Sequence, residues 1–320
     1  MTGLSRVFEW TGPSPDPNDE QFGDVIESAD LDAAGEYTAV LVGEPYDGAV
    51  IGRRGAREGP RALREALAAT KTHHVDAGPV DSVADLGDVQ VPLAADPADE
   101  GADGYGGDVA AVQSAVASVT SAVHDAAAVP VFLGGDNSLT VPNARPLVER
   151  GSLGVLSFDA HLDCRELGDG PTSGTPYRQL FAAGLESLAV VGARHFETST
   201  AYHDYLHDEG GRVLTAEQVA VDPIDALDDA IASLGDCEAI YVSLDLDVLD
   251  AAAAPGVSAP TPGGLSTREL FRMLAHVTTH GRVAGFEVVE CAPPLDTGDR
   301  TARAGSRAVA HFLASLEGAS

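Results

Sequence analysis

The stretch SFDAHLDCR places Asp159, His161 and Asp163 at every second position. The stretch SLDLDVLD repeats this spacing with Asp245 and Asp247. Alternate side chains of an extended segment point to the same face, so each stretch should direct its carboxylates toward one place. Acids gathered in this way repel one another strongly unless cations lie among them. The spacing therefore predicts a metal site.

The residue types at this site indicate which ion it binds and what the ion does. Carboxylates with a single imidazole favour a hard or borderline ion such as Mn²⁺ over zinc in a thiolate site. A bridging carboxylate from each stretch would hold two ions roughly 3.5–4 Å apart. A water trapped between them would ionise near neutral pH, because its pKa falls from about 15.7 toward about 7 at well-studied metal sites. Hydroxide attacks a trigonal carbon, so the expected chemistry is hydrolysis.

Short apolar, β-branched runs that alternate with amphipathic or alanine-rich segments must position these residues. Near-continuous hydrophobic strands between helices indicate a parallel sheet buried on both faces. Periodicity fits an open three-layer sandwich and a closed barrel equally well. The expected strands are 37–43, 82–88, 129–135, 154–160, 188–194, 212–215, 239–247 and 283–290, and the expected helices are 58–70, 108–127, 199–209, 222–234, 266–279 and 301–316.

Polar clusters follow four of the expected strands. GGDNS follows the third strand, DAHLD the fourth and DLDVLD the seventh, and Glu290 ends the eighth. In a sandwich or a barrel the functional edge lies at the carboxyl ends of the strands. The four clusters are therefore expected to meet at this edge.

Length and composition bound the class of protein. The chain has 320 residues, 44% of them hydrophobic, and neither an internal repeat nor a clear linker divides it. We expect one domain over residues 1–320, with residues 1–36 as an N-terminal extension that packs on it. An apolar run of membrane-spanning length and a signal peptide are both absent from the sequence, so the expected location is the cytoplasm. Cys164, Cys237 and Cys291 are widely spaced, which suits a reducing compartment.

The net charge is strongly negative. Fifty acidic residues against nineteen basic ones give −31. Nucleic acid and anionic membranes are therefore poor partners, because both bind basic faces. The excess is typical of a solvated acidic surface in a salt-rich cytoplasm, where counterions screen the repulsion, and it does not bear on the reaction.

Four segments, in their order and spacing, resemble the ureohydrolase family, which includes arginase, agmatinase and formimidoylglutamase. They are GGDNS, SFDAHLDCR, SLDLDVLDAAAAPGVSAPTPGG and EVVECAPPLD. The resemblance runs from about Leu41 to the C-terminus. It implies an arginase-like fold, an open α/β/α sandwich on an eight-stranded, mostly parallel sheet. It also implies two Mn²⁺ per chain and a homo-oligomer, either a trimer or a hexamer.

The resemblance also implies roles for individual residues. Asp159 and Asp245 match the carboxylates that bridge the two manganese ions. Asp163 would bind the first ion and hydrogen-bond the hydroxide, with Asn137 as the outer ligand of that ion. The usual motif is GGDHS, and the asparagine that replaces its histidine can coordinate Mn²⁺ through the amide oxygen, without the affinity of imidazole. One ion is therefore expected to bind loosely.

The second ion would be completed by His161 and Asp247. Glu290 matches the acid that grips the amidine or guanidine nitrogens of the substrate, so Asp163 and Glu290 are the expected catalytic residues. Arginases carry a histidine in an HG-x-P segment after the DAHxD strand, where this chain has Ser173 in SGTPYRQL, so Ser173 and Glu290 are expected to bind the substrate. Segments of the SGTP type, and asparagine in GGDNS, resemble the formimidoylglutamase branch, as do the segments around Trp10 and in GARHFETSTAYHDYL.

This branch acts on N-formimidoyl-L-glutamate, an amidine with two carboxylates. The loop IGRRGAREGPRALR leaves the first strand at the functional edge, and its arginines can hold a carboxylate in two hydrogen bonds. We expect a substrate-binding role for at least one of Arg53, Arg54 and Arg57. Arg61 and Arg64 lie at helical spacing and could instead pair with neighbouring glutamates.

The expected activity is manganese-dependent hydrolysis of N-formimidoyl-L-glutamate to L-glutamate and formamide, a step in histidine degradation. An agmatinase or arginase that releases urea is the alternative, and the net charge alone favours agmatine, which is a dication. A second alternative is a non-catalytic relative that is poor in metal because of Asn137.

Overall fold

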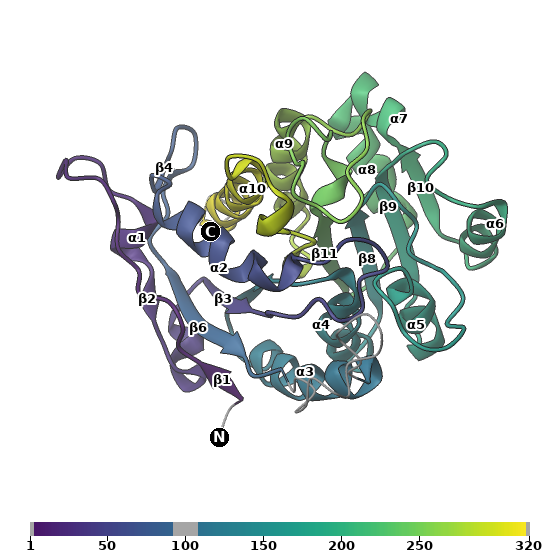
Figure 1. The fold of residues 1–320 in the computed structure, drawn as a ribbon, viewed down its shortest axis with the longest axis horizontal. Helices are drawn as coiled ribbons and strands as arrows, with labels where there is room; N and C mark the ends of the chain where they lie inside the picture. The colour runs from purple at the N-terminus through teal and green to yellow at the C-terminus, as the bar shows by residue number, and fades with distance from the viewer. Residues whose placement is uncertain (1–2, 92–107, 318–320) are drawn as a thin grey trace.

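A large sheet forms the centre of the computed structural model, which describes residues 3–91 and 108–317 (Figure 1). Eight strands run parallel to one another across it, and all eight correspond to strands expected from the hydrophobic runs. Their spatial order is β6 (Val83–Val89), β3 (Ala39–Gly43), β7 (Val129–Leu133), β12 (Val283–Val289), β11 (Ala239–Asp245), β8 (Leu153–Phe158), β9 (Ser187–Ala193) and β10 (Arg212–Thr215).

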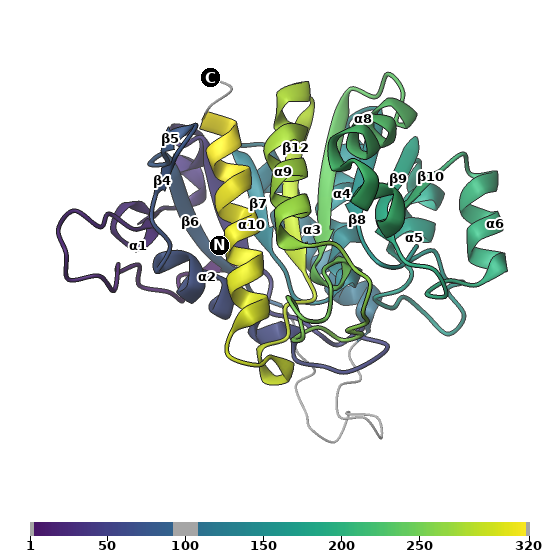
Figure 2. The ribbon, with the colours of Figure 1, turned by 90° about the horizontal axis from the view of Figure 1, so that it is seen from above.

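Helices cover both faces of this sheet, and Figure 2 shows α8, α9 and α10 on one of the two faces. Each set of helices packs on its own hydrophobic cluster. The first set is α2 (Gly59–Ala68), α7 (Ala216–Val221), α8 (Pro223–Ser233), α9 (Thr267–Val277) and α10 (Arg300–Glu317), and the second set is α3 (Val109–His124), α4 (Thr140–Val148), α5 (Pro176–Ala183) and α6 (Thr200–Asp208).

Strand β3 illustrates why the expected strands were almost wholly apolar. Ala39 and Leu41 belong to one hydrophobic cluster, and Val40 and Val42 belong to the other. Successive side chains of a strand point to opposite faces, so a strand covered on both sides must be apolar at every position. The sheet has β10 at one edge and the short strand β1 at the other, which makes it open. The three-layer sandwich is confirmed and the barrel is not.

The first thirty-six residues add two very short strands to the eight. β1 (Leu4–Ser5) pairs antiparallel with β6, and β2 (Glu27–Ser28) pairs with β6 in parallel. A one-turn helix, α1 (Phe22–Val25), follows the loop that contains Trp10. The Trp10 indole Nε1 donates a hydrogen bond of 2.9 Å to Asp85 Oδ2 on β6. This segment is thus attached to the sheet through backbone pairing and through a buried carboxylate.

That carboxylate belongs to a buried ion network. The Arg64 side chain is fully buried, and its Nε and Nη2 donate to the two oxygens of Asp85 at 2.8 and 2.9 Å. Its Nη1 lies 2.6 Å from Asp88 Oδ1. Arg61, one turn earlier, is exposed and pairs with Glu65 at 2.9 Å. The helical pairing considered as the alternative for both arginines is therefore found for Arg61, whereas Arg64 joins α2 to β6.

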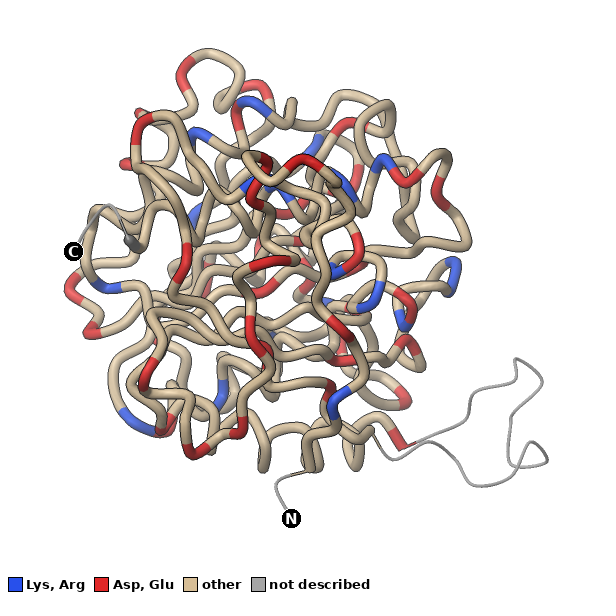
Figure 3. The backbone as a smooth tube through the Cα atoms, turned by 90° about the vertical axis from the view of Figure 1, so that its left-hand side faces the viewer, with Lys and Arg blue, Asp and Glu red and all other residues tan. Residues whose placement is uncertain are grey.

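Acidic positions recur throughout the fold. Figure 3 shows Asp and Glu distributed over the whole of this view, with fewer Lys and Arg among them. Among residues 3–91 and 108–317, every helix is too short or too polar to cross a membrane.

We predict opposite consequences for the two arginines of α2. Replacing Arg64 by Met leaves the carboxylates of Asp85 and Asp88 without their cation, which should lower the free energy of unfolding by about 3–5 kcal/mol. Replacing Arg61 by Met removes an exposed pair and should leave the transition unchanged within error. Denaturant unfolding of both variants at the same salt concentration checks this. Equal stability of the two variants would mean that the buried network does not hold α2 to β6.

Candidate metal centre

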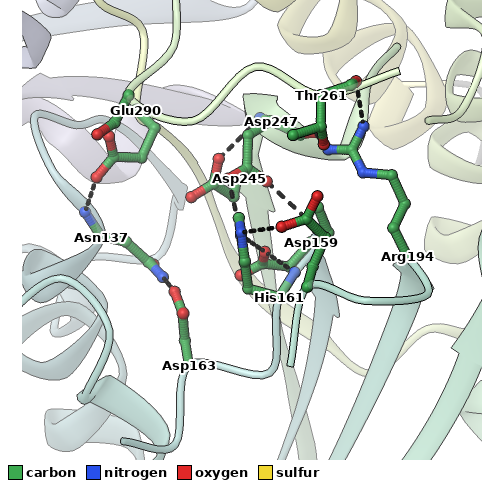
Figure 4. Close-up of polar contacts among 12 residues, drawn as sticks. Asn137, Asp159, His161, Asp163, Arg194, Asp245, Asp247, Thr261 and Glu290 are labelled. Atoms are coloured by element: carbon green, nitrogen blue, oxygen red, sulfur yellow. Dashed lines mark hydrogen bonds and ion pairs between the residues drawn. The ribbon is translucent and has the colours of Figure 1, made fainter. Parts of the chain in front are cut away.

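The chain segments after β7, β8, β11 and β12 meet at one edge of the sheet and bring the predicted ligands together (Figure 4). At this edge, two groups of side chains have ligand atoms within 4.8 Å of one another. One contains Asp159, Asp163 and Asp245, and the other contains Asp159, His161 and Asp247. Asp159 belongs to both groups, as a residue between two ions would.

The local structure that produces this convergence differs from the prediction. The acids were expected to alternate along extended strands, but β8 ends at Phe158 and β11 ends at Asp245. In each case the first aspartate caps the turn that follows: Asp159 Oδ1 accepts from the His161 amide at 2.7 Å, and Asp245 Oδ1 accepts from the Asp247 amide at 2.8 Å. Hydrogen bonds of this type, between a side chain and a nearby backbone amide, turn the chain directly after the strand ends. The groups therefore converge through two turns and not through the pleat of a strand.

Backbone conformation at two site residues is unusual. Asp163 has φ of 41° and Glu290 has φ of 62°, values that residues with a β-carbon rarely adopt. A site held in this way costs conformational energy that the surrounding structure must offset. Glu290 is fixed by its amide, which donates to the Gly135 carbonyl at 2.9 Å. The two positions predicted to be catalytic are thus set by tertiary contacts.

The loops after β8 and β11 are also tied to each other. His161 Nδ1 lies 3.0 Å from Asp247 Oδ2, and the Ala160 amide donates to Asp247 Oδ1 at 3.3 Å. Arg194, at the end of β9, is buried and donates to the backbone carbonyls of Asp247 and, at 2.8 Å, Thr261. The sequence indicated no such role for Arg194, which positions the loop after β11.

Asn137 lies between the two predicted catalytic residues. Its backbone amide donates to Glu290 Oε1 at 3.1 Å, and its Nδ2 donates to Asp163 Oδ2. Its Oδ1 lies 2.7 Å from the Thr140 hydroxyl, which also lies 2.6 Å from Glu287 Oε1. One hydroxyl has a single proton for these two acceptors. A half-turn of the amide would let Nδ2 donate to Thr140 Oγ1 and would point Oδ1 toward Asp163, as metal ligation requires.

Beneath Asn137, a buried acid supports this arrangement. Glu287 on β12 is fully buried and accepts hydrogen bonds at both of its oxygens. Ser243 and Thr140 each lie 2.6 Å from Oε1, and Tyr241 and Asn143 lie 2.8 and 2.9 Å from Oε2. Four hydrogen bonds in a buried setting hold this carboxylate in one position. Glu287 therefore fixes Thr140, and Thr140 fixes the amide of Asn137.

The pKa values of the site residues reflect a concentration of buried negative charge. Burial raises the pKa of Asp159, Asp245 and Glu290 well above the ordinary range, and the repulsion of neighbouring carboxylates adds to the effect. Burial, partly offset by His161, raises the pKa of Asp163 to about 6. Burial acts to lower the pKa of His161, but Asp247 and Asp159 outweigh it and raise that pKa. Burial and mutual repulsion thus oppose the ionised forms of Asp159, Asp245 and Glu290, whereas His161 lowers the pKa of Asp247 despite its burial.

The donor set fits divalent cations. Asp159 Oδ2 and Glu290 Oε2 are buried and have no hydrogen-bond partner among the described residues. Buried carboxylate oxygens normally have such partners, and a bound cation satisfies them equally well. Oxygen ligands with one imidazole are the set that Mn²⁺ accepts. Orphaned oxygens, raised carboxyl pKa values and a single imidazole all agree with a hard or borderline cation.

A cavity of about 160 Å³ opens over these groups. Among the predicted substrate-binding residues, Ser173 and Glu290 line it. The Ser173 hydroxyl accepts from the Ile51 amide at 3.3 Å, which joins the SGTP segment to the loop after β3. The lining residues are Ile51, Gly52, Asn137, His161, Asp163, Arg165, Ser173, Gly174, Asp245, Asp247, Ser258, Ala259 and Glu290.

The loop after β3 reaches this cavity through Ile51 and Gly52, and its three arginines are not among the lining residues. Arg53 donates to the carbonyls of Val257 and Ser258, and Arg57 pairs with the buried Asp47 at 2.6 Å. The structure places Arg53, Arg54 and Arg57 outside the lining of this cavity, and their substrate-binding role stays a prediction. Arg165, which stands within the SFDAHLDCR stretch itself, lines the cavity and was missed.

An open α/β/α sandwich that gathers buried carboxylates and one imidazole at its strand ends defines a class of metal-dependent hydrolases. The chain belongs to the arginase family, whose sequence profile matches residues 37–314.

Known members of this family resemble the chain over nearly its whole length. It is 57% identical to the formimidoylglutamase of Halobacterium salinarum over 98% of this chain and 100% of that protein. The crystal structure of the Bacillus subtilis formimidoylglutamase superposes with a TM-score of 0.85 at 28% identity, covering 97% of this chain and 96% of that one. The structure of Trypanosoma cruzi formiminoglutamase with Mn²⁺ gives a TM-score of 0.80 at 26% identity, covering 93% and 99%.

We predict that replacing Asp245 by Asn changes stability with opposite signs in the two metal states. A carboxyl whose pKa is raised on folding lowers stability as pH rises above its ordinary value of 3.8. In metal-free protein at pH 8 the neutral amide should therefore raise the free energy of unfolding by about 1 kcal/mol or more, less so at pH 5. With manganese present the variant should lose most of the stabilisation that the ions give to the wild type.

Asp250→Asn is the matched control, because two backbone amides lower the pKa of Asp250 and its charge is favoured. It should be less stable than the wild type in both states. Thermal unfolding with manganese and with chelator gives all the comparisons. A metal-free Asp245→Asn protein that is less stable than the wild type would contradict the repulsion described above.

Proposed function

We propose that this chain is a formimidoylglutamase, which hydrolyses N-formimidoyl-L-glutamate to L-glutamate and formamide. The observation that carries the proposal is the 57% identity to the Halobacterium salinarum formimidoylglutamase across 98% of this chain. The carboxylate-lined cavity at the strand ends supports it, because an amidine is a planar cation that carboxylates bind well.

The metal assignment is part of the proposal. We assign two Mn²⁺ to the site, with Asp159 and Asp245 between them. Asp163 and Asn137 would complete the first ion, since the half-turn of the amide described above directs its oxygen toward Asp163. His161 and Asp247, from the other group, would complete the coordination of the second ion.

In the proposed reaction, water attacks the amidine carbon, a C–O bond forms, and the bond from that carbon to the glutamate nitrogen breaks. Bound Mn²⁺ ions supply Lewis acidity that makes water nucleophilic near neutral pH. Asp163 accepts the proton of the attacking water and passes it to the departing nitrogen, so that L-glutamate leaves as an amine. Glu290 accepts hydrogen bonds from the amidine N–H groups and orients the carbon for attack.

Agmatine would be attracted by the net charge of −31. Apart from the few acids of the site, Asp and Glu are spread over the whole fold (Figure 3), so counterions screen most of the field of the net charge at physiological salt. Local contacts decide between substrates, and the comparison with formimidoylglutamases therefore outweighs the net charge. We also propose that the protein is a cytoplasmic, single-domain enzyme, as the sequence predicts, and a homo-oligomer, as the family resemblance implies.

We predict that manganese-loaded protein releases formamide and L-glutamate from N-formimidoyl-L-glutamate and does not release urea from agmatine or L-arginine. Separate incubations with each substrate, analysed for all three products, check this. Urea from agmatine without formamide from formimidoylglutamate would replace the proposal by agmatinase. No turnover together with less than one manganese per chain at saturation would favour a non-catalytic relative.

We predict that Asn137→His tightens the binding of manganese, because imidazole binds divalent metals more strongly than an amide oxygen does. Manganese content after prolonged dialysis, measured per chain, should rise relative to the wild type. Asn143→His is unsuitable as a control because Asn143 is bonded to Glu287, whereas Asn18→His changes an exposed asparagine in the N-terminal loop. Unchanged retention in Asn137→His would show that residue 137 is not a ligand.

A further inference from the structure

We propose that Asp228, His276 and His280 form a second metal site, which binds one borderline divalent cation such as Zn²⁺ and joins two helices. The three side chains offer ligand atoms within 4.8 Å of one another, and none of them lines the cavity over the manganese ligands. The inference goes beyond the proposed function, because it does not depend on which amidine the enzyme hydrolyses.

The two histidines lie on successive turns at the end of one helix. His276 is in the last turn of α9, and His280 ends the 3₁₀ turn Thr278–His280 that continues it. Residues four apart in a helix face the same side, so both imidazoles are directed to one place. Asp228 belongs to α8, which packs beside α9 on the same face of the sheet (Figure 2). A cation held by all three would join α8 to the end of α9.

The distances between the three groups suit a single ion. His276 Nε2 lies 2.9 Å from Asp228 Oδ1, and His280 Nε2 lies 3.5 Å from the same oxygen. Two ligands at bond lengths of about 2.0–2.1 Å around a tetrahedral zinc are separated by about 3.3 Å. The observed distances fall on either side of this value. Small movements of the side chains would therefore place all three atoms around one ion.

His280 Nε2 is the atom that points to a ligand. This nitrogen is buried and has no hydrogen-bond partner among the described residues, although Asp228 Oδ1 is only 3.5 Å away. Buried polar atoms normally have such a partner. The nearer position on that oxygen is taken by His276 Nε2. A cation between the three groups would satisfy both imidazoles and the carboxylate at once.

The surroundings of the cluster favour a cation. It lines a cavity of about 590 Å³, in which Asp236 is a further carboxylate. The C-terminal end of a helix carries a partial negative charge, and both histidines lie at that end of α9. Arg282 also lines the cavity, but its Nη1 donates to the carbonyls of Gly235 and Cys237 at 2.8 and 3.1 Å. Asp228 is half exposed, so an ion can enter from solvent.

The donor set differs from that of the manganese centre. Two imidazoles and one carboxylate suit Zn²⁺ and similar borderline ions, whereas a site with mostly oxygen ligands suits Mn²⁺. Three protein ligands also leave room for water in the coordination shell. The two sites should therefore select different metals from a mixture.

The cluster and the manganese centre lie at opposite edges of the sheet. His280 lies just before β12, whereas Glu290 directly follows it. β12 has seven residues and therefore spans about 23 Å at about 3.3 Å per residue. The second site is thus remote from the reacting groups, and we assign it a structural role, the stabilisation of α8 against α9.

Equilibrium dialysis of manganese-loaded protein against Zn²⁺, with both metals counted per chain, tests the site. His280→Gln and Asp228→Ala each remove one ligand. Asp228→His supplies a third imidazole, whose Nδ1 is as many bonds from the backbone as the lost Oδ1. His207→Gln is the matched control, because His207 is an exposed histidine on α6 and lies outside the cluster. The manganese count shows whether zinc has displaced manganese at the other centre.

We expect the wild type and His207→Gln to bind one more Zn²⁺ per chain than His280→Gln and Asp228→Ala. The affinity of these two variants should fall at least about 10- to 100-fold, the loss that follows removal of a group that merely supports a ligand. Asp228→His should keep the ion. At a hundredfold excess over the dissociation constant, zinc should raise the thermal midpoint of the wild type by about 3–5 °C more than that of either loss variant.

Equal zinc binding by the wild type and His280→Gln would overturn the site and would mean that the histidines only pair with Asp228. A loss of zinc in His207→Gln as large as that in His280→Gln would also overturn it, because the ion would then be bound without specificity. Manganese content equal to that of the wild type would show that each variant is folded. The proposed function fails separately, since a protein that releases no formamide could still bind zinc here.

Discussion

Repulsion among buried carboxylates is the constraint on which the rest of this structure depends. Asp159, Asp245, Asp247 and Glu290 are all 5% exposed or less and lie at one edge of the sheet. Taking even one carboxylate out of water is costly unless a counter-charge goes with it. In the protein alone, the pKa values of Asp159 and Asp245 are raised by burial and repulsion, and the neighbouring acids raise that of His161, which favours its cationic form. Divalent cations would compensate the negative charge more effectively. They would also act as Lewis acids in the cavity that an amidine can enter.

The scaffold keeps these groups together against their repulsion. Caps at Asp159 and Asp245 turn the chain as soon as the strands end, and Arg194 holds the loop after β11 by its carbonyls. Below the site, Glu287 gathers four donors, one of which is the hydroxyl that orients Asn137. The wall of the cavity is formed by segments from different strands, which accounts for its mixed character of acids, a serine and one arginine. A rigid sandwich thus carries a site made almost wholly of loops.

The eight parallel strands and the edge that carries the site could be predicted from the sequence, because burial constrains the residue types of the strands. Strands covered on both faces must be apolar throughout, so the eight parallel strands stand out as hydrophobic runs, and acids that interrupt the ends of such runs mark the functional edge. The left-handed conformations of Asp163 and Glu290 could not be predicted, because aspartate and glutamate carry no local signal for positive φ. Arg165 and the arginines after β3 have the same chemistry, and only tertiary placement shows which of them faces the cavity.

We propose that the carboxylates converge because they share cations. A crystal structure of the protein grown with manganese, with anomalous diffraction data collected at the manganese edge, tests it most directly. The account predicts two anomalous peaks roughly 3.5–4 Å apart, with the carboxylate of Asp159 and that of Asp245 each in contact with both. Clear density for an empty site, with the Asp159 side chain turned away from Asp245 at saturating manganese, would contradict it.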